Sequence, residues 1–550
     1  MPEQLHPVLR RVYAARGFGQ GDLGLELSQL LAPGGLLGID AAAARLAQAI
    51  RDRERIVIAG DYDADGATAT SVAVLGLRAL GAADVQYVVP DRFRMGYGLS
   101  PALADEAIAL GAQVLVTVDN GISSHAGVER ARRAGVSVIV TDHHLPGAAA
   151  VPADAIVNPN QPGCAFASKH LAGVGVMFYV LLALRARLRD EGAFGGGNGP
   201  NLAELLDLVA IGTVADVVRL DHNNRILVEQ GLRRIRAGRT RPGVMALLRA
   251  AGRLPAHLTA ADIGFGIGPR LNAAGRLDDM RVGIECLLAD SAAAAEPRAQ
   301  SLERFNRDRR EIQEQMHFDA LELVGAAGVG LTVFHPDWHE GVVGLVASRL
   351  KEARHRPVVA FARAQAAGEL KGSGRSIPGV HLRDVLAAVD ARQPGLILRF
   401  GGHAMAAGLS LAEADLAAFE RAFDAACASV VEPDQLQRVI ETDGPLAAEE
   451  LTLDTALTLE RAGPWGQGCP EPAFDNDFSV IDARPVGSDG RHVRYRLATA
   501  DDGAVVEAIH FDGAQSLCAG GQVRVAYVPT VNRYRGLEAL NLRVIHLEPA

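Results

Sequence analysis

The sequence contains few cysteines. Its five cysteines are scattered from Cys164 to Cys518, and none forms a CxxC pair. This spacing excludes a zinc ribbon, and it is not typical of a disulfide scaffold. The cysteine content therefore indicates a protein of a reducing compartment, and we expect it in the cytoplasm.

Long apolar runs are also missing. The longest, Leu171 to Leu184, has 14 residues, whereas a membrane-spanning helix needs roughly 20. The N-terminus, MPEQLHPVLRRVYAARG, has no apolar core of the kind found in secretory signals. We therefore expect a buried helix at 171–184 and no membrane partner.

Two common catalytic loops are absent as well. The chain has neither a GxSxG elbow nor a GxxxxGK[ST] phosphate loop. The glycines of Gly264–Gly268 lack GxGxxG spacing and precede Pro269, so they do not predict a dinucleotide loop. The chemistry must come from other residues.

The overall composition is that of a globular protein. Of its 550 residues, 49% are hydrophobic and 22% are charged, which excludes a mainly disordered chain. The formal net charge of −10 excludes a uniformly basic nucleic-acid coat. A local basic groove is still allowed, because steering depends on local potential.

The order of apolar runs predicts the fold. Short runs such as RIVIA (55–59), VLVTV (114–118) and VSVIVT (136–141) alternate with helical stretches, which indicates βαβ units and a parallel sheet. A long polar helix at 297–324 is placed to join two lobes. From residue 473 short alternating strands predict a small barrel or sandwich. We expect an α/β fold divided as follows: an N-terminal extension (1–45), a catalytic domain (46–235), a helical connector with a long linking helix (236–327), a smaller α/β domain (328–435), and a linker with a β-barrel (436–550).

The strongest chemical signal is DYDADG, which follows the first predicted strand. Three carboxylates, Asp61, Asp63 and Asp65, are costly to bring together unless cations neutralise them, and carboxylate oxygens suit Mg²⁺ or Mn²⁺. Gly66 would permit a tight turn into the next helix. The alternatives are a calcium loop or a plain acidic turn. An EF-hand loop fails because its twelfth position is Val72 rather than glutamate.

Further acidic groups follow two other predicted strands. Asp119 comes after VLVTV, and Asp142 with His143 and His144 comes after VSVIVT. An aspartate at one strand end is often only a helix cap. Three such groups at the carboxyl ends of parallel strands predict a metal centre instead, and Asp216 offers a further carboxylate. Mixed histidine and carboxylate ligands fit two divalent cations, which would catalyse phosphoester or phosphoanhydride hydrolysis.

These motifs resemble a known superfamily. The order DYDADG, VDNG, TDHH and GTVADVV is similar to the DHH phosphoesterases, and three later segments, HEGVVG (339–344), GSGRS (372–376) and GGHAMAAG (401–408), resemble the DHH-associated domain. RLNAAGR (270–276) and the β-rich C-terminus narrow the resemblance to the RecJ family. The resemblance implies a DHH domain, a DHH-associated domain and a C-terminal OB-fold. It also implies a 5′→3′ exonuclease for single-stranded DNA that releases mononucleotides in DNA repair and recombination.

The resemblance also implies roles for the acidic residues. Asp63 would bind the first Mn²⁺ or Mg²⁺ ion, Asp65 the second, and Asp119 would bridge them. His143 and Asp216 would complete the second ion's ligands. Asp61 and His144 would contact a ligand, a water or the scissile phosphate. The catalytic set implied is therefore Asp61, Asp119, His143 and His144.

The resemblance also implies that arginines and glycines bind the phosphates of the substrate. The GSGRS loop offers backbone N–H groups and an arginine fork for a phosphate. His403 in GGHAMAAG could donate to a phosphate, and the family places an arginine near the DNA 5′ end. The residues implied for substrate binding are Arg92, Arg270, Asn272, Arg276, Ser373, Gly374, Arg375, Gly402 and His403.

The C-terminal β region offers a second DNA-binding surface. Tyr527, Tyr534 and Phe511 could stack bases, unless they belong to the core of the barrel. Arg524, Arg533 and Arg535 could follow the phosphates.

Two other functions remain open. A DHH phosphodiesterase for short oligonucleotides or cyclic dinucleotides would share the first two lobes, but the β-rich C-terminus argues against it. A non-catalytic DNA-binding scaffold would lack ligands that are present here. The partners expected are single-stranded DNA and, from the family, a single-strand-binding protein and a helicase, with the protein acting as a monomer.

Overall fold

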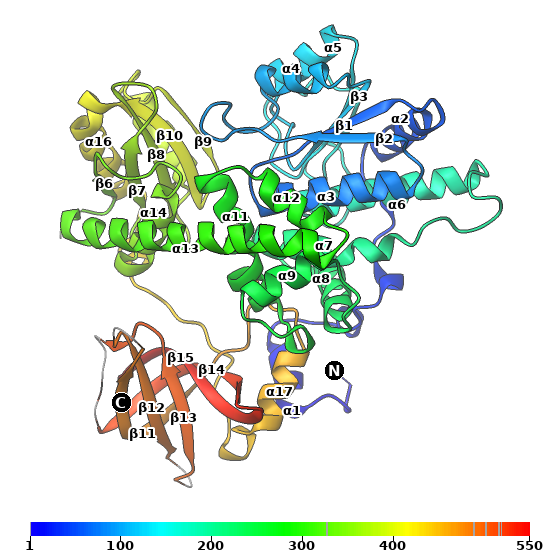
Figure 1. The fold of residues 1–550 in the computed structure, drawn as a ribbon. Helices are drawn as coiled ribbons and strands as arrows, with labels where there is room; N and C mark the ends of the chain where they lie inside the picture. Colours follow the sequence, from blue (N-terminus) through cyan, green and yellow to red (C-terminus); the bar gives the residue numbers. More distant parts are fainter. Residues whose placement is uncertain (1, 326–327, 488–489, 501–502, 515–517, 519) are drawn as a thin grey trace.

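The computed structural model describes residues 2–325, 328–487, 490–500, 503–514, 518 and 520–550. Three β units are arranged around a set of helices, and one long helix crosses the front of the molecule (Figure 1). The predicted α/β architecture with a C-terminal barrel is confirmed.

The first unit is a parallel sheet of five strands in the order β2-β1-β3-β4-β5. Its strands are β1 (Arg55–Ala59), β2 (Asp84–Val88), β3 (Val114–Val118), β4 (Ser137–Thr141) and β5 (Ala155–Val157). The strand β3 is buried along its whole length, as its unbroken apolar sequence requires. The predicted parallel sheet is therefore correct.

Helices cover both faces of this sheet. One face packs on α2 (Ile39–Arg51), α3 (Ala64–Ala79) and α6 (Gly173–Asp190), and the other on α4 (Pro101–Ala109) and α5 (His125–Arg133). The boundary that we placed at residue 45 falls inside α2, because this helix packs on the sheet as one piece. The apolar run at 171–184 is the buried part of α6, as expected.

A helical region follows the sheet. It contains α7 (Leu206–Ala215), α8 (His222–Arg236), α9 (Pro242–Ala250), α10 (Ala260–Asp262), the π-helix η6 (Ile263–Ile267), α11 (Gly268–Leu277), α12 (Arg281–Leu288) and α13 (Ala292–Leu323). At 1.5 Å per residue, the 32 residues of α13 extend about 48 Å. Figure 1 shows α13 running from the helical region to the second lobe, as its polar sequence predicted.

The second lobe has a mixed sheet in the order β6-β7-β8-β10-β9. Its strands are β6 (Leu331–Phe334), β7 (Val358–Arg363), β8 (Glu369–Arg375), β9 (Arg399–Gly402) and β10 (Ala406–Ala412). Only β6 and β7 pair in parallel. The helices of this lobe are α14 (Val343–Arg354), α15 (Leu382–Arg392) and α16 (Leu416–Ala428).

The C-terminal unit is a closed barrel in the order β11-β12-β13-β15-β14. Its strands are β11 (Phe474–Val486), β12 (His492–Thr499), β13 (Val505–His510), β14 (Gln522–Tyr534) and β15 (Leu537–Pro549). Tyr527 is fully buried inside it and its hydroxyl donates to Asn476 at 2.7 Å. The prediction that Tyr527 stacks bases is therefore wrong, because alternation along β14 turns this ring into the barrel.

The N-terminal segment ties the barrel to the rest of the chain. The helix α1 (Pro7–Ala15) packs on α17 (Leu453–Arg461), and the Tyr13 hydroxyl donates to the Ala462 carbonyl at 3.1 Å. Arg16 pairs with Asp443 at 2.7 Å. Short 3-10 turns lie at Gln20–Asp22, Leu27–Gln29, Pro33–Gly35, Leu202–Leu205, Pro255–His257, Glu413–Asp415, Pro433–Leu436 and Ala448–Glu450.

Among the described residues, no single helix has the length and apolar character to cross a membrane. One bent pair, Leu27–Gly35 with Ile39–Arg51, has that length and apolar character only when its two parts are taken together.

Candidate active site

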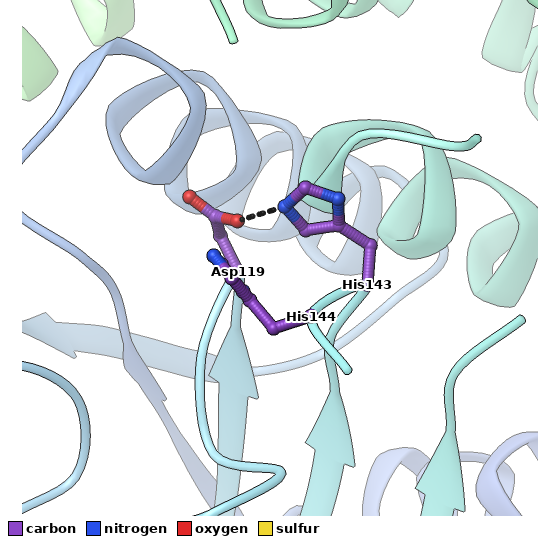
Figure 2. Close-up of side chains that lie close together, drawn as sticks. All are labelled: Asp119, His143 and His144. Carbon is purple, nitrogen blue, oxygen red and sulfur yellow. Dashed lines mark ion pairs between the residues drawn. The ribbon is translucent and has the colours of Figure 1, made fainter. Parts of the chain in front are cut away.

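Neighbouring strand ends bring the predicted acidic residues together. Asp61 follows β1, Asp119 follows β3, and Asp142 begins the segment after β4, and these strands are adjacent in the sheet. Asp119 has a left-handed backbone (φ 62°) directly after β3. In Figure 2 its carboxylate faces the ring of His143, with His144 beside them.

Two aspartates come from the start of α3. Asp63 caps this helix and accepts a hydrogen bond from the Gly66 N–H at 2.9 Å. Asp65 accepts from the N–H groups of Gly173 (2.6 Å) and Val174 (3.0 Å) at the start of α6. We had expected Gly66 to form a turn, but it is part of α3. A Cβ there would lie 2.7 Å from Asp61. The glycine is required by close packing.

His143 lies between two carboxylates. Its Nε2 is 3.1 Å from the Asp119 Oδ1 and 3.4 Å from the Asp216 Oδ2, which comes from the C-cap of α7. Burial, and then the neighbouring His144, lower the pKa of His143 below its ordinary value. The ring is therefore neutral near pH 7, as a metal ligand must be.

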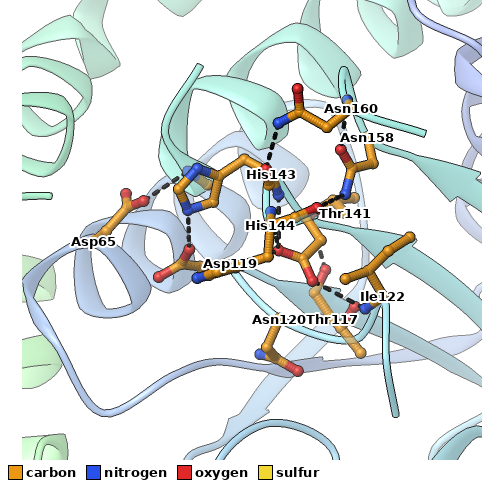
Figure 3. A network of polar contacts seen from close by, with 12 residues as sticks. Asp65, Thr117, Asp119, Asn120, Ile122, Thr141, His143, His144, Asn158 and Asn160 are labelled. Atoms are coloured by element: carbon orange, nitrogen blue, oxygen red, sulfur yellow. Dashed lines mark hydrogen bonds and ion pairs between the residues drawn. The ribbon is translucent and has the colours of Figure 1, made fainter. Parts of the chain in front are cut away.

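A hydrogen-bond network holds both histidines from behind (Figure 3). The Asp142 carboxylate accepts from the N–H groups of His143 (2.7 Å) and His144 (3.1 Å), and it pairs with the His144 Nδ1 at 2.8 Å. Asn160 donates to the His143 carbonyl (2.6 Å) and Asn158 to the His144 carbonyl (2.9 Å). The backbone of the histidine pair is therefore fixed at four points, both N–H groups and both carbonyls.

Burial and mutual repulsion perturb these carboxyl groups. Burial, and then Asp216, raise the pKa of Asp65 to about 7; burial, and then Asp63, raise the pKa of Asp216 to about 8. The pKa values of Asp61 and Asp119 are raised well above the ordinary range, first by burial and then by neighbouring aspartates. Each further carboxylate makes ionisation of the others more costly.

The donor set fits divalent cations. The ligand atoms of Asp61, Asp63 and Asp119 lie within 4.8 Å of one another, and so do those of Asp65, His143 and Asp216. Asp61 Oδ1 is buried without a hydrogen-bond partner among the described residues, and Asp119 Oδ1 and His143 Nε2, which face each other at 3.1 Å, form no hydrogen bond there either. Unpartnered buried oxygens and a neutral imidazole are ligands that Mn²⁺ or Mg²⁺ would satisfy. Two neighbouring ligand groups could hold two such ions.

A second set of charges, all positive, stands close to this cluster. Burial, and then Arg92 and Arg375, lower the pKa of Arg276 to about 9. Among the described residues, neither Arg92 nor Arg276 nor Arg375 forms an ion pair with a carboxylate. Burial, and then Arg92, also lower the pKa of Arg375. Three arginines this close together, without acidic partners, have the charge and hydrogen-bond donors that an anion requires.

The two lobes meet at this cluster. His403, from the second lobe, stacks on His144 with ring centroids 6.3 Å apart. The Ser373 hydroxyl accepts from Arg375 at 3.0 Å on β8. Gly402, with φ 145°, ends β9, which is separated from β8 by β10. Gly374 is packed under Leu382. Of these four predicted residues, His403 contacts the first lobe's cluster. Ser373 and Gly374 lie on β8, and Gly402 lies on β9, in the sheet of the second lobe.

Two predicted substrate residues are engaged by the protein itself. Arg270 donates to the Gly266 carbonyl (2.6 Å) and pairs with Glu303 (2.5 Å). Asn272 accepts from the Ala64 N–H at 2.8 Å, so it fixes the start of α3. Their contact with substrate remains a prediction.

Sequence reasoning missed several residues of the site. The Tyr97 hydroxyl donates to the Asp119 carbonyl and lies 3.1 Å from the His144 Nδ1. Asn158, Asn160 and Gly173 had no motif to mark them. Their roles depend on contacts between distant segments.

Comparisons with known proteins agree with this geometry. Three family models match: DHH family, N-terminal domain (residues 55–213), DHHA1 domain (326–431) and RecJ OB domain (442–546). The single-stranded-DNA-specific exonucleases RecJ of Dickeya dadantii and Escherichia coli are 52% and 49% identical over 100% of this chain and 97% of their own. The crystal structure of Thermus thermophilus RecJ in complex with Mn²⁺ superposes with a TM-score of 0.83 at 33% identity, covering 100% of this chain and 76% of that one. The same protein with Mg²⁺ gives a TM-score of 0.78.

Proposed function

The chain belongs to the RecJ family of single-stranded-DNA-specific exonucleases, and we propose that its aspartate–histidine cluster hydrolyses single-stranded DNA from the 5′ end. The observation that carries this proposal is that the carboxylate–histidine cluster lies close to a group of arginines. Buried carboxylates and His143 lie without enough partners of their own, and arginines without acidic partners stand close to them. A phosphodiester with divalent cations would satisfy both.

The cluster divides between two cations, Mn²⁺ or Mg²⁺. Asp61, Asp63 and Asp119 would hold the first ion and Asp65, His143 and Asp216 the second, and Asp119, which also reaches His143, would contribute to both. Such ions supply an activated water and neutralise charge on the phosphate that is cut. Since the Nε2 of His143 faces the carboxylates, the hydrogen bonds of Asn160 and Asp142 to its backbone keep that atom on the cluster side.

His144 is protonated near pH 7, whereas His143 is neutral. Burial would lower the pKa of His144, but the hydrogen bond and charge of Asp142 outweigh burial and raise that pKa to about 9. The protonated ring stands beside Asp119 and Tyr97. It is placed to donate a proton or a hydrogen bond to a phosphate oxygen.

The arginines position the DNA. We assign Arg276 and Arg375 to a phosphate, and Arg92, whose guanidinium lies 4.6 Å from the Tyr62 ring centroid, to the 5′ end. His403 and Ser373 add donors from the second lobe. The exposed rings of Phe511 and Tyr534 and the side chain of Arg535 would form a separate DNA-binding surface on the barrel, whereas Arg524 and Arg533 are paired with acids.

The test is digestion of single-stranded DNA labelled at either end, with Mn²⁺ or Mg²⁺ and with EDTA, beside a blunt duplex. We expect immediate release of the 5′ label as mononucleotide, a shortening ladder from the 3′ label and an intact duplex. Asp119→Ala should abolish hydrolysis and keep DNA binding. If only short oligonucleotides or cyclic dinucleotides are cleaved, the substrate proposed here is wrong. If no metal-dependent hydrolysis is observed, the results favour a non-catalytic DNA-binding scaffold.

The wider setting follows from the family. We propose that the protein acts in the cytoplasm as a monomer in DNA repair and recombination, on strands supplied by a helicase and covered by a single-strand-binding protein. Co-purification with either partner, and the mass of the protein in solution, test these points.

A further inference from the structure

One buried amide joins the two strands that lead to Asp61 and Asp119. The Asn120 side chain is fully buried, and its Nδ2 donates to the carbonyl of Ala59 at 3.1 Å and to that of Val118 at 2.9 Å. Ala59 ends β1, and Val118 ends β3. The amide therefore bridges the ends of two adjacent strands, at the edge of the sheet where the aspartates follow them.

The bridge lies next to metal ligands in the chain. Asp61 follows Ala59 by two residues. Asp119 follows Val118 directly. The two aspartates belong to one group whose ligand atoms lie within 4.8 Å of one another, and carboxylates so close together repel each other unless cations lie between them. The two hydrogen bonds of the amide thus act against a force that would part the strand ends.

The side chain of Asn120 is suited to this connection by its two donors. Both of its partners are carbonyl oxygens, which only accept hydrogen bonds, so the nitrogen must face them. A primary amide nitrogen carries two hydrogens, one for each carbonyl, whereas a hydroxyl carries one. The Oδ1 atom is left buried without a hydrogen-bond partner among the described residues, which costs free energy. The position is therefore better explained by what the nitrogen holds than by packing alone.

A tight turn places the amide over the end of its own strand. Asp119 and Gly121, on either side of Asn120, have left-handed backbones with φ 62° and 112°. A Cβ on Gly121 would lie 2.5 Å from the Thr117 Oγ1, a contact that glycine avoids. In Figure 3 the Asn120 side chain lies below that of Asp119. The pairing of β1 with β3 ends at Ala59 and Thr117, so the amide extends the connection past the last paired residues.

Asp119 is held through its own backbone as well. The Tyr97 hydroxyl donates to the Asp119 carbonyl, and the Asp119 N–H donates to the Thr141 carbonyl, both at 3.1 Å. A Cβ on Gly98 would lie 3.8 Å from the Asn120 Cβ, so the segment that carries Tyr97 also packs on the amide. These contacts fix Asp119 relative to β4 and to this segment, whereas the bond of Asn120 to β1 fixes it relative to the strand of Asp61.

We propose that Asn120 is a positioning residue that sets the distance between Asp61 and Asp119, and thereby the spacing of the two cations. This inference rests on the proposed function, because it requires that the cluster hold two cations with Asp119 contributing to both. Without the amide, repulsion would separate the strand ends in the metal-free protein, and a cation would have to draw them together again. Metal binding would then be weaker.

The experiment compares Asn120→Ala and Asn120→Ser with the unchanged full-length protein. Serine is the milder change: it keeps one donor but can bond only one of the two carbonyls, so it also loses the bridge. In calorimetric titrations we expect both variants to bind Mn²⁺ about 10- to 100-fold more weakly. In electron paramagnetic resonance, the unchanged protein loaded with Mn²⁺ should show exchange coupling between the two ions, and the coupling should be weaker in both variants.

The matched control is Asn224→Ala. Asn224 is also fully buried, and its Nδ2 bridges two carbonyls, those of His170 (2.6 Å) and Arg219 (2.9 Å), neither of which adjoins a metal ligand in the chain. Its Oδ1 is likewise buried without a partner among the described residues. Thermal unfolding of the metal-free proteins should show a similar loss of stability in Asn224→Ala and Asn120→Ala. Mn²⁺ affinity and coupling should be retained in Asn224→Ala.

The outcomes separate this inference from the proposed function. Unchanged Mn²⁺ affinity and coupling in both Asn120 variants would overturn the inference and leave the proposed function intact. An equal loss of affinity in Asn224→Ala would also overturn it, since general destabilisation would then explain the effect. Absence of Mn²⁺ binding in the unchanged protein would overturn the proposed function and this inference together.

Discussion

Gly173 lies against Asp119 so closely that a Cβ on the glycine would be 2.5 Å from the Asp119 Cβ. The same glycine donates its N–H to Asp65 at 2.6 Å. The start of α6 therefore touches the proposed bridging ligand and a ligand of the second ion at once, so the spacing of the cluster depends on a residue with no side chain.

Gly173→Ala should separate these ligands. We expect the added methyl group to displace Asp119 or α6, to weaken Mn²⁺ binding at least tenfold and to lower kcat. Calorimetric titration with Mn²⁺ beside the nuclease assay checks this. Gly175→Ala is the control: its Cβ would be 3.3 Å from a terminal methyl group of Leu171, which needs to shift by only a few tenths of an ångström, so near-normal binding is expected there. Equal behaviour of the two variants would contradict the role of Gly173.

Metal binding should release protons near neutral pH. Burial and neighbouring carboxylates raise the pKa of Asp65 to about 7 and that of Asp216 to about 8, so both groups hold protons in the metal-free protein for part of the time at pH 7. A cation must displace these protons, and apparent affinity should therefore rise as pH increases from 6 to 8.5. Titrations in two buffers of different ionisation enthalpy measure the protons released, and Asp216→Asn should release fewer.

The same shifts govern the stability of the metal-free protein. Between the ordinary carboxyl pKa of 3.8 and the raised values of about 7 and 8, the folded chain holds more protons than the unfolded chain. The free energy of unfolding should therefore fall as pH rises through this window. Thermal unfolding with and without Mn²⁺ tests the sign, and the gain from the metal should be larger at pH 8 than at pH 5.

Asp142→Asn should weaken the support of both histidines. Burial raises the pKa of Asp142, but the hydrogen bond and charge of His144 outweigh it and hold that pKa below the ordinary value. An amide lacks this charge, so the pKa of His144 should fall and the alkaline limb of the kcat profile should move to lower pH. We expect activity to fall about 10- to 100-fold. An unchanged pH profile would show that the charge of His144 has no part in turnover.

The attachment of the barrel depends on Arg16 and Asp443. Their side chains are 18% and 10% exposed, Arg16 makes two hydrogen bonds to the carboxylate, at 3.0 and 2.7 Å, and a third to the Pro470 carbonyl. Asp443→Asn leaves a buried guanidinium poorly paired, and should cost about 1–3 kcal/mol and expose the linker to protease. Glu450→Gln, which breaks the more exposed pair with Arg11, should change proteolysis little.

Much of the site was predictable because its residues follow strands whose apolar runs are visible in the sequence. Asp61, Asp119 and His143 could be assigned to neighbouring strand ends before any coordinates. Asp216 was predicted from the family motif, and the structure brings it to His143 from a separate helix. Tyr527 was misjudged because a tyrosine in an alternating strand can face either side.

The sequence by itself determined the family, the parallel sheet, the linking helix, the barrel and the acidic residues at the strand ends. All of these depend on local periodicity or on motifs within a few residues. Only the tertiary structure decided that Gly173 backs Asp119, that arginines from three segments lie close to one another, and that Asn158 and Asn160 hold the histidine pair. The physical reason is that such contacts join segments far apart in the chain, and packing of the whole molecule fixes their distances.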